Sequence, residues 1–139
     1  MEKDVIIEIK SEQIIDGQTE SYEMKTLGKI SRESGAVCLT YDETPATGMD
    51  GVTTTLHVER DIVTLSRSGS QQSRLFLEKG KRHLCHYDTG FGEIMIGISA
   101  SEIISSIEQI GGSLFMKYNV DINAGLASQN TINIKVTEV

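Results

Sequence analysis

Arg67 is the residue whose type and position suggest chemistry most directly. It follows Val63 and Leu65 at two-residue spacing, so in an extended strand the three side chains lie on one face. If Val63 and Leu65 face a core, the guanidinium does too, and a buried guanidinium requires a carboxylate or several carbonyl groups. One interpretation is an anchor for an anionic ligand. The other, which is commoner in proteins, is an internal ion pair, for instance with Asp88 or Glu93.

Phenol and hydroxyl groups form the second set of candidates. Tyr87 and Thr89 share one face of a predicted strand with Cys85, and Tyr118 lies on a later strand. A few polar groups in an apolar wall are typical of small-molecule pockets. The alternative is that each tyrosine packs its ring in the core and hydrogen-bonds to backbone, while Thr89 shapes a bend. The candidate ligand-binding residues are therefore Arg67, Tyr87, Thr89, Tyr118 and Glu93.

Metal binding and nucleophilic catalysis have little support. His83 and Cys85 share a strand face, and only Cys38 and His57 on other strands could join them. A zinc site needs three or four ligands, and the chain has no closely spaced Cys-Cys or His-His pair. It also has no G-x-S-x-G nucleophile motif, and no helix follows Gly92, as a dinucleotide-binding loop requires. We expect no metal, no cofactor and no catalytic residue.

One enzymatic alternative stays open. Triphosphate-tunnel enzymes are antiparallel barrels whose early strand carries the motif Glu-x-Glu-x-Lys facing the lumen. The segment Ile6 to Lys10 of this chain resembles that motif. Here Ile6 stands where the first Glu should be, which weakens a metal site. Such a tunnel also needs several inward cations, for which Arg67, Arg74 and Arg82 are available. This alternative predicts a metal-dependent phosphohydrolase.

The elements that must position these residues are β-strands. Of the 139 residues, 37 are Ile, Val or Thr, which favour pleated strands, and only 5 are Ala. Strict alternation of apolar and polar residues begins at Val5, and Asp16-Gly17 is typical of a type I′ hairpin turn. Residues 42–51 and 123–129 are predicted loops. The expected later strands are Ala36–Asp42, Val52–Glu59, Asp61–Ser68, Arg74–Lys79, Lys81–Thr89, Glu93–Ser99, Leu114–Ile122 and Thr131–Val136.

About eight to ten strands with short connections predict an all-β, antiparallel up-and-down meander. A meander of that size closes into a barrel or splits into a sandwich, and closure removes exposed edges. One segment is ambiguous: Ile103, Ile104, Ile107 and Ile110 fit a short helix, but a strand leading to Gly111-Gly112 explains them too, and we favour the strand. We predict a single domain over residues 1–139.

The middle of the chain resembles a known family. The run 65–69 (LSRSG), Phe76, Gly80, the run 87–93 (YDTGFGE) and Lys117-Tyr118 resemble the YwiB-like family of uncharacterised bacterial proteins. The resemblance spans about Val63 to Tyr118. It implies a calycin-like barrel and supplies no activity, since the family's function is not established.

Charge and composition exclude other classes. The net charge of −7 argues against a nucleic-acid partner, which requires a basic face. No apolar run is long enough for a membrane span, and Met1 to Asp4 is too acidic to open a signal peptide. Two cysteines suit a reducing compartment. We therefore expect a cytoplasmic protein without membrane association, which can form a homo-oligomer.

The leading functional hypothesis combines these expectations. It is a non-enzymatic barrel whose interior binds a small, partly apolar, anionic ligand, with Arg67 orienting the charged end. The alternative from a different class is an interaction or structural module, in which the barrel interior is filled and the function lies on its outer face or loops. A cavity larger than a water molecule distinguishes the two.

Overall fold

Ten β-strands form one closed antiparallel barrel. The computed structural model describes residues 2–43, 51–69, 72–88, 92–107, 111–123 and 125–139. Each strand pairs with its neighbour in sequence, and β1 pairs with β10 to close the ring. The prediction of an up-and-down barrel is therefore confirmed. The strands are β1 (Lys3–Ile15), β2 (Gln18–Glu33), β3 (Ala36–Asp42), β4 (Val52–Glu59), β5 (Ile62–Gly69), β6 (Ser73–Glu78), β7 (Arg82–Asp88), β8 (Glu93–Ser105), β9 (Gly111–Ile122) and β10 (Gly125–Glu138).

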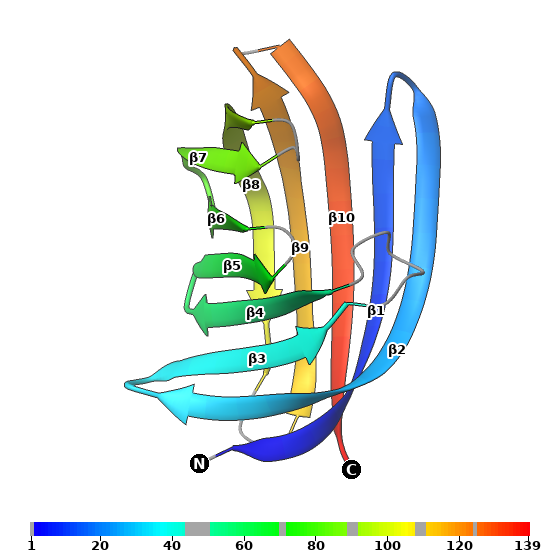
Figure 1. Ribbon diagram of the computed structural model, residues 1–139, viewed down its shortest axis with the longest axis vertical. Coiled ribbons are helices and arrows are strands. Elements are labelled where there is room, and N and C mark those ends of the chain that lie inside the picture. Colours follow the sequence, from blue (N-terminus) through cyan, green and yellow to red (C-terminus); the bar gives the residue numbers. More distant parts are fainter. Residues whose placement is uncertain (1, 44–50, 70–71, 89–91, 108–110, 124) are drawn as a thin grey trace.

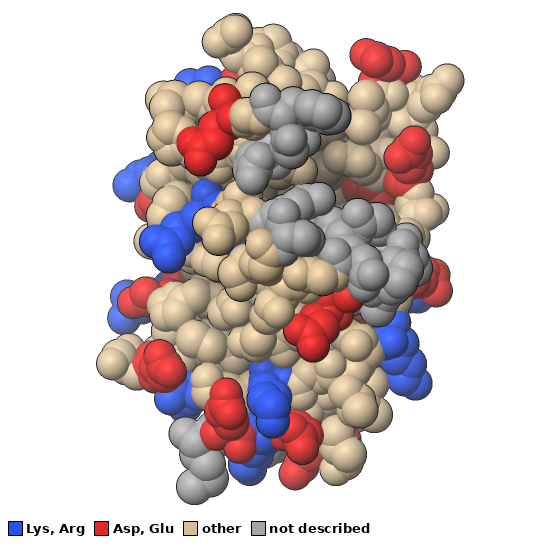
Figure 2. All heavy atoms as spheres, in the orientation of Figure 1, with Lys and Arg blue, Asp and Glu red and all other residues tan. Residues whose placement is uncertain are grey.

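Long and short strands occupy different parts of the wall. Strands β1, β2, β9 and β10 are long and run upright in Figure 1, whereas the short strands β3 to β7 cross on the other side. No helix is present in the described residues, so none could cross a membrane. Lys and Arg alternate with Asp and Glu over the face in Figure 2 and form no large patch of one sign.

Two hairpin turns have the backbone conformation that their residue types favour. Asp16 and Gly17 both have positive φ (51° and 77°), as do Ser34 and Gly35 (49° and 84°). Two consecutive residues of this kind define type I′ turns, whose twist matches that of paired strands. The alternation begun at Val5 thus continues from β1 through its hairpin into β2.

The core fills one end of the barrel. Side chains of the expected inward parity, such as Val5, Ile7 and Ile9 on β1, are almost completely buried. Each strand contributes in the same way, because alternate residues point to the same face. The largest fully buried side chains are Ile7, Ile30, Leu39, Leu56, Leu77, Ile98, Leu114 and Met116.

Two local predictions needed correction or completion. The predicted loop 123–129 is wrong, because β10 begins at Gly125 and accommodates its polar residues with a bulge between Leu126 and Ser128. The ambiguous segment is a strand as far as Ser105, with a bulge between Ala100 and Glu102, and its residues 108–110 lie outside the described part. Residues 44–50 of the predicted loop 42–51 also lie outside it.

Candidate functional site

The other end of the barrel interior contains a cavity of about 400 Å³. It is large compared with the roughly 30 Å³ that one water molecule occupies in the liquid. Its walls come from eight strands, and polar and apolar side chains line it in about equal number. The lining residues are Ser11, Gln13, Tyr22, Arg67, Leu75, Tyr87, Ile94, Ile96, Tyr118, Val120, Ile122, Ser128, Asn130 and Ile132.

One row of residues across the short strands carries Arg67. Arg67 on β5 pairs with Thr54 on β4 and with Ser73 on β6. Thr54 pairs with Tyr41 on β3, and Ser73 pairs with Tyr87 on β7. Residues directly opposite each other in a ladder share a face of the sheet. The inward parity of Arg67 therefore makes the whole row a polar belt above the apolar core.

A second row faces it from the long strands. Tyr118 on β9 pairs with Asn130 on β10, and Asn130 pairs with Gln13 on β1. Ser128 and Asn130 are both buried, at 6% and 7% exposure, and the Asn130 Nδ2 donates to Ser128 Oγ at 3.0 Å. This row supplies the cavity with amide and hydroxyl groups.

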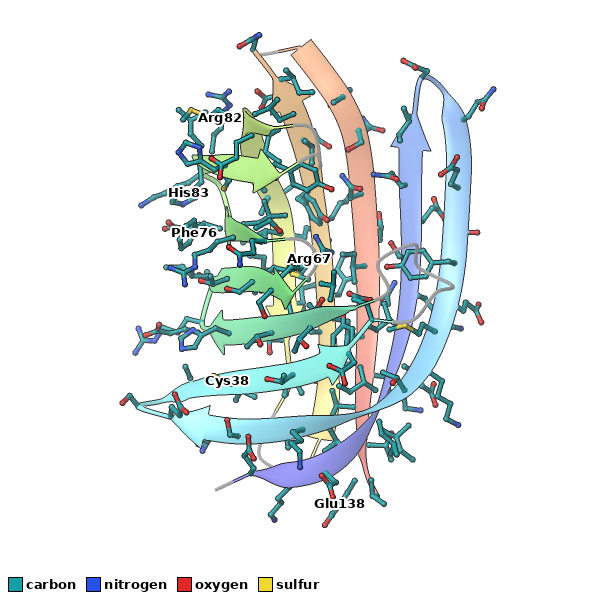
Figure 3. The ribbon with its side chains drawn as sticks, viewed as in Figure 1. Cys38, Arg67, Phe76, Arg82, His83 and Glu138 are labelled. Carbon is teal, nitrogen blue, oxygen red and sulfur yellow. The ribbon has the colours of Figure 1, made fainter. Side chains whose placement is uncertain are left out.

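Arg67 is partly buried, and one nitrogen of its side chain has no partner in the described part of the chain. Its Nε is buried and has no hydrogen-bond partner among the described residues. Figure 3 shows Arg67 beside β5, on the side that faces the long strands. A buried donor of a charged group without a partner costs about 1–3 kcal/mol or more.

The predicted carboxylate partner is on the wrong face. Glu93 is exposed, because the next residue of β8, Ile94, lines the cavity. The Glu93 carboxylate instead lies 3.7 Å from Nδ1 of His86 on β7. The side chain of Asp88 is outside the described part of the structure. Strand alternation therefore separates Glu93 from the interior.

A buried acid was not identified from the sequence. Glu43 follows β3 directly, is only 6% exposed, and accepts a hydrogen bond from Thr54 Oγ1 at 2.6 Å. Burial is the main reason why the pKa values of Tyr22 and Tyr41 are raised; the negative charge of Glu43 raises them further, whereas Arg67 lowers them. Glu43 thus lies near the polar belt, behind Thr54, and is not among the described residues that line the cavity. The sequence does not indicate the burial of Glu43, because the turn-forming residues of 42–51 predict an exposed loop.

The phenols around Arg67 are held in their neutral form. Burial raises the pKa of Tyr118 to about 12, although the positive charge of Arg67 opposes the change. Burial also raises the pKa of Tyr22, while a hydrogen bond with Ser11 partly offsets it. The pKa of Tyr41 is raised too, chiefly by burial. At neutral pH these groups are hydrogen-bond donors that carry no charge.

Arg67 also borders a groove on the outer face, of about 500 Å³, over β5, β6 and β7. Cys85, Glu93 and Arg74 line the same groove. Here the wall is weakly paired: the register between β6 and β7 holds the single pair Ser73 and Tyr87. The guanidinium therefore lies at a thin point of the barrel wall.

The predicted site residues divide into three groups. Arg67, Tyr87 and Tyr118 line the interior cavity together. Glu93 lies in the outer groove, and Thr89 lies outside the described residues. Sequence reasoning missed Tyr22, Ser128 and Asn130. The alternation of Ser128, Asn130, Ile132 and Ile134 was the available signal, which the predicted loop concealed.

The geometry does not match a triphosphate tunnel. Glu8 and Lys10 face away from the core, and Glu8 lies 3.8 Å from Lys25 on the outer surface. Arg82 is also on the outside, where it forms hydrogen bonds of 2.6 and 3.0 Å with Asp121. Among the described residues, no group of three His, Cys, Asp or Glu side chains could hold a metal ion.

A larger hollow of about 870 Å³ lies elsewhere on the surface. Side chains that face away from the core line it, among them Glu8, Lys10 and Lys135. It lacks both the buried guanidinium and the tyrosines, so the interior cavity is the better candidate site.

Fold and site together define a class: a closed ten-stranded antiparallel barrel with an apolar core at one end and a cavity lined by both polar and apolar side chains at the other. A family model described as "Domain of unknown function (DUF1934)" matches residues 7–134, so the chain belongs to the DUF1934 family. The crystal structure of the YwiB protein from Bacillus subtilis resembles the barrel with a TM-score of 0.87 and 23% sequence identity, covering 99% of this chain and 93% of that one. That likeness establishes the fold. A comparison with curated proteins found no match.

Proposed function

We propose that the barrel is a non-enzymatic binding protein for a small, partly apolar ligand that carries one anionic group. The observation that carries the proposal is that the cavity is lined by Arg67, whose buried Nε has no hydrogen-bond partner among the described residues. A carboxylate bound in the cavity would pair with the guanidinium and neutralise its charge, since the planar guanidinium matches a carboxylate in shape.

The remaining cavity chemistry supports the same ligand. Tyr87 and Tyr118 border the cavity together with Arg67 and can donate to the same anion. Ile96 and Val120 give the ligand an apolar surface. A cavity of about 400 Å³ lies within the range of roughly 300–1,000 Å³ that is usual for small-molecule sites. Its size also argues against the alternative of a filled barrel that acts only as an interaction module.

Matched pairs of acids and neutral analogues test the proposal. Isothermal titration calorimetry with benzoate and decanoate, each beside its methyl ester, measures the contribution of the anionic group. We expect the acids to bind at least about tenfold more tightly than the esters, because each charge-assisted hydrogen bond is worth roughly 1.5–3 kcal/mol.

Substitution of the anchor completes the experiment. Arg67→Gln should abolish the preference for the acids. Arg32→Gln removes a charge from an exposed position on β2 and should leave the preference unchanged. Equal binding of acids and esters, or acid binding that survives Arg67→Gln, would contradict the proposal.

A further inference from the structure

The cavity has two chemically different walls. The wall formed by β8 and β9 beyond Tyr118 is aliphatic, with Ile94, Ile96, Val120 and Ile122. The wall formed by β1 and β10 is largely amide and hydroxyl, with Ser11, Gln13, Ser128 and Asn130. A ligand that fills the space must meet both walls at once.

The polar wall is costly to cover with hydrocarbon. Ser128 and Asn130 are more than nine-tenths buried. Their mutual hydrogen bond uses one of the Asn130 amide protons, so the Asn130 Oδ1 is still able to accept and the Ser128 hydroxyl to donate. An alkyl chain lying against this wall would strip these groups of water and give nothing in return. A ligand with hydroxyl or ring N–H groups along one edge would satisfy them.

The polar wall also lies close to the anchor. Asn130 pairs directly with Tyr118, and Tyr118 is near enough to Arg67 for the guanidinium charge to lower its pKa. The acid group and the hydrogen-bonding edge of the ligand must therefore be close together. A compact molecule with substituents near its acid group meets this requirement, whereas a straight alkyl chain offers no hydrogen-bonding edge beside its carboxylate.

We infer that the ligand is a compact ring-based acid with hydrogen-bonding substituents along one edge, of the class of hydroxylated aromatic or heteroaromatic carboxylates. This inference rests on the proposed function and narrows its ligand class. The flat apolar face of such a ring would pack on Ile96 and Val120, its carboxylate would meet Arg67, and its hydroxyl or N–H groups would reach Ser128 and Asn130.

Three acids test the inference by calorimetry: protocatechuate, which has two ring hydroxyls, benzoate, which has none, and decanoate, which is a straight chain. We expect protocatechuate to bind about tenfold more tightly than either of the others, since it makes one or more additional hydrogen bonds to buried partners. Decanoate binding as tightly as protocatechuate would overturn the inference.

Two asparagines of β10 provide a matched pair of variants. Asn130→Ala should reduce the preference for protocatechuate over benzoate to about twofold or less, and benzoate affinity should stay the same. Asn133→Ala changes an exposed residue of the same strand and should leave the preference intact. If Asn130→Ala does not fold, as judged by circular dichroism, Gln13→Ala on the same wall replaces it. A preference that survives Asn130→Ala, or Gln13→Ala where it takes the place of Asn130→Ala, would overturn the inference.

The two proposals fail in different ways. If none of the three acids binds, the proposed function itself fails. If all three bind with equal affinity and Arg67→Gln weakens all of them, the anionic site stands and only the ring-acid inference fails.

Discussion

Arg67 and Tyr118 face each other across the barrel interior from strands β5 and β9, which are not neighbours in the sheet. Burial raises the pKa of Tyr118 to about 12, and the guanidinium of Arg67 holds it below the value that burial alone would give. Closure of the barrel creates this relationship, because no short-range pairing connects the two residues. The pKa of the Tyr118 phenol therefore reports the charge of Arg67.

The first prediction uses this dependence of the pKa on charge. In Arg67→Gln the pKa of Tyr118 should rise further, since the stabilising cation is gone while burial persists. NMR of carbon-labelled tyrosine, with Tyr118→Phe to assign the resonance, measures the change. Arg32→Gln serves as the control on the outer surface. A Tyr118 pKa that does not change in Arg67→Gln would mean that solvent screens the guanidinium from the phenol.

The second prediction concerns stability at alkaline pH. The pKa of Tyr118 is raised in the folded state, from 10.0 to about 12, so the folded protein holds the phenolic proton more tightly than the unfolded chain. This contribution to stability is fully present below pH 10 and is lost as the pH rises from about 10 to about 12. Over this interval we expect the unfolding free energy of Tyr118→Phe to fall by about 1–2 kcal/mol less than that of the wild type, because the variant lacks the titrating phenol.

Urea unfolding just below pH 10 and near pH 12 measures that difference. Tyr22 and Tyr41, whose pKa values are also raised, add losses of the same sign to both proteins. They therefore cancel in the comparison. Parallel stability curves for the wild type and Tyr118→Phe would contradict the prediction.

The third prediction separates a binding role for Arg67 from a structural one. Arg67→Met keeps a long side chain and removes the buried donor. In the absence of ligand we expect the variant to be as stable as the wild type or more stable by up to about 2 kcal/mol, because a residue held for binding carries a cost in the empty protein. Chemical denaturation measures the difference.

The opposite result has a definite meaning. If Arg67 balances the buried charge of Glu43 through the region of Thr54, Arg67→Met leaves that charge behind. The loss would then be about 3–5 kcal/mol. Glu43→Gln, tested alone and with Arg67→Met in a double-mutant cycle, measures the coupling directly.

Much of the barrel follows from local rules in the sequence. Alternation fixed the faces of β1, and the same parity placed Arg67 on the side of Val63 and Leu65. Asp16-Gly17 fixed a hairpin through the positive φ of both residues. Such rules act between neighbours in the chain, so they are legible without a structure.

The site needed long-range information. Strand number and register bring Tyr118 and Asn130 opposite Arg67, and these depend on closure of the whole ring. The inward position of Ser128 and Asn130 could not be predicted from the sequence, because a polar segment is equally typical of an exposed loop. The burial of Glu43 could not be predicted for the same reason, since nothing in its neighbourhood signals burial.

The final prediction concerns the weak pairing between β6 and β7. Six residue pairs join β5 to β6 and seven join β7 to β8, but the register of β6 with β7 has the one pair Ser73 and Tyr87, beside an isolated bridge from Glu78 to Lys81 just before β7. The Phe76 amide on this side donates to Cys85 Sγ at 3.4 Å, and sulfur is a weak acceptor. This seam should therefore open locally at lower free energy than the rest of the wall.

Native-state hydrogen exchange tests the seam within a single strand. Successive amides of a strand point to opposite sides, so Phe76 faces β7, whereas Leu75 and Leu77 face the well-paired β5. We expect the Phe76 amide to exchange at least about tenfold faster than its two neighbours, a difference of roughly 1.4 kcal/mol in opening free energy.

A bound acid provides a second test of the seam. Because Arg67 borders both the cavity and the outer groove at this seam, an acid bound to Arg67 should slow the exchange of Phe76 selectively. Equal exchange rates for the amides of Phe76, Leu75 and Leu77 would contradict the prediction of a weak seam. They would mean that the hydrogen bond to Cys85 Sγ and side-chain packing stabilise the seam as much as regular strand pairing does.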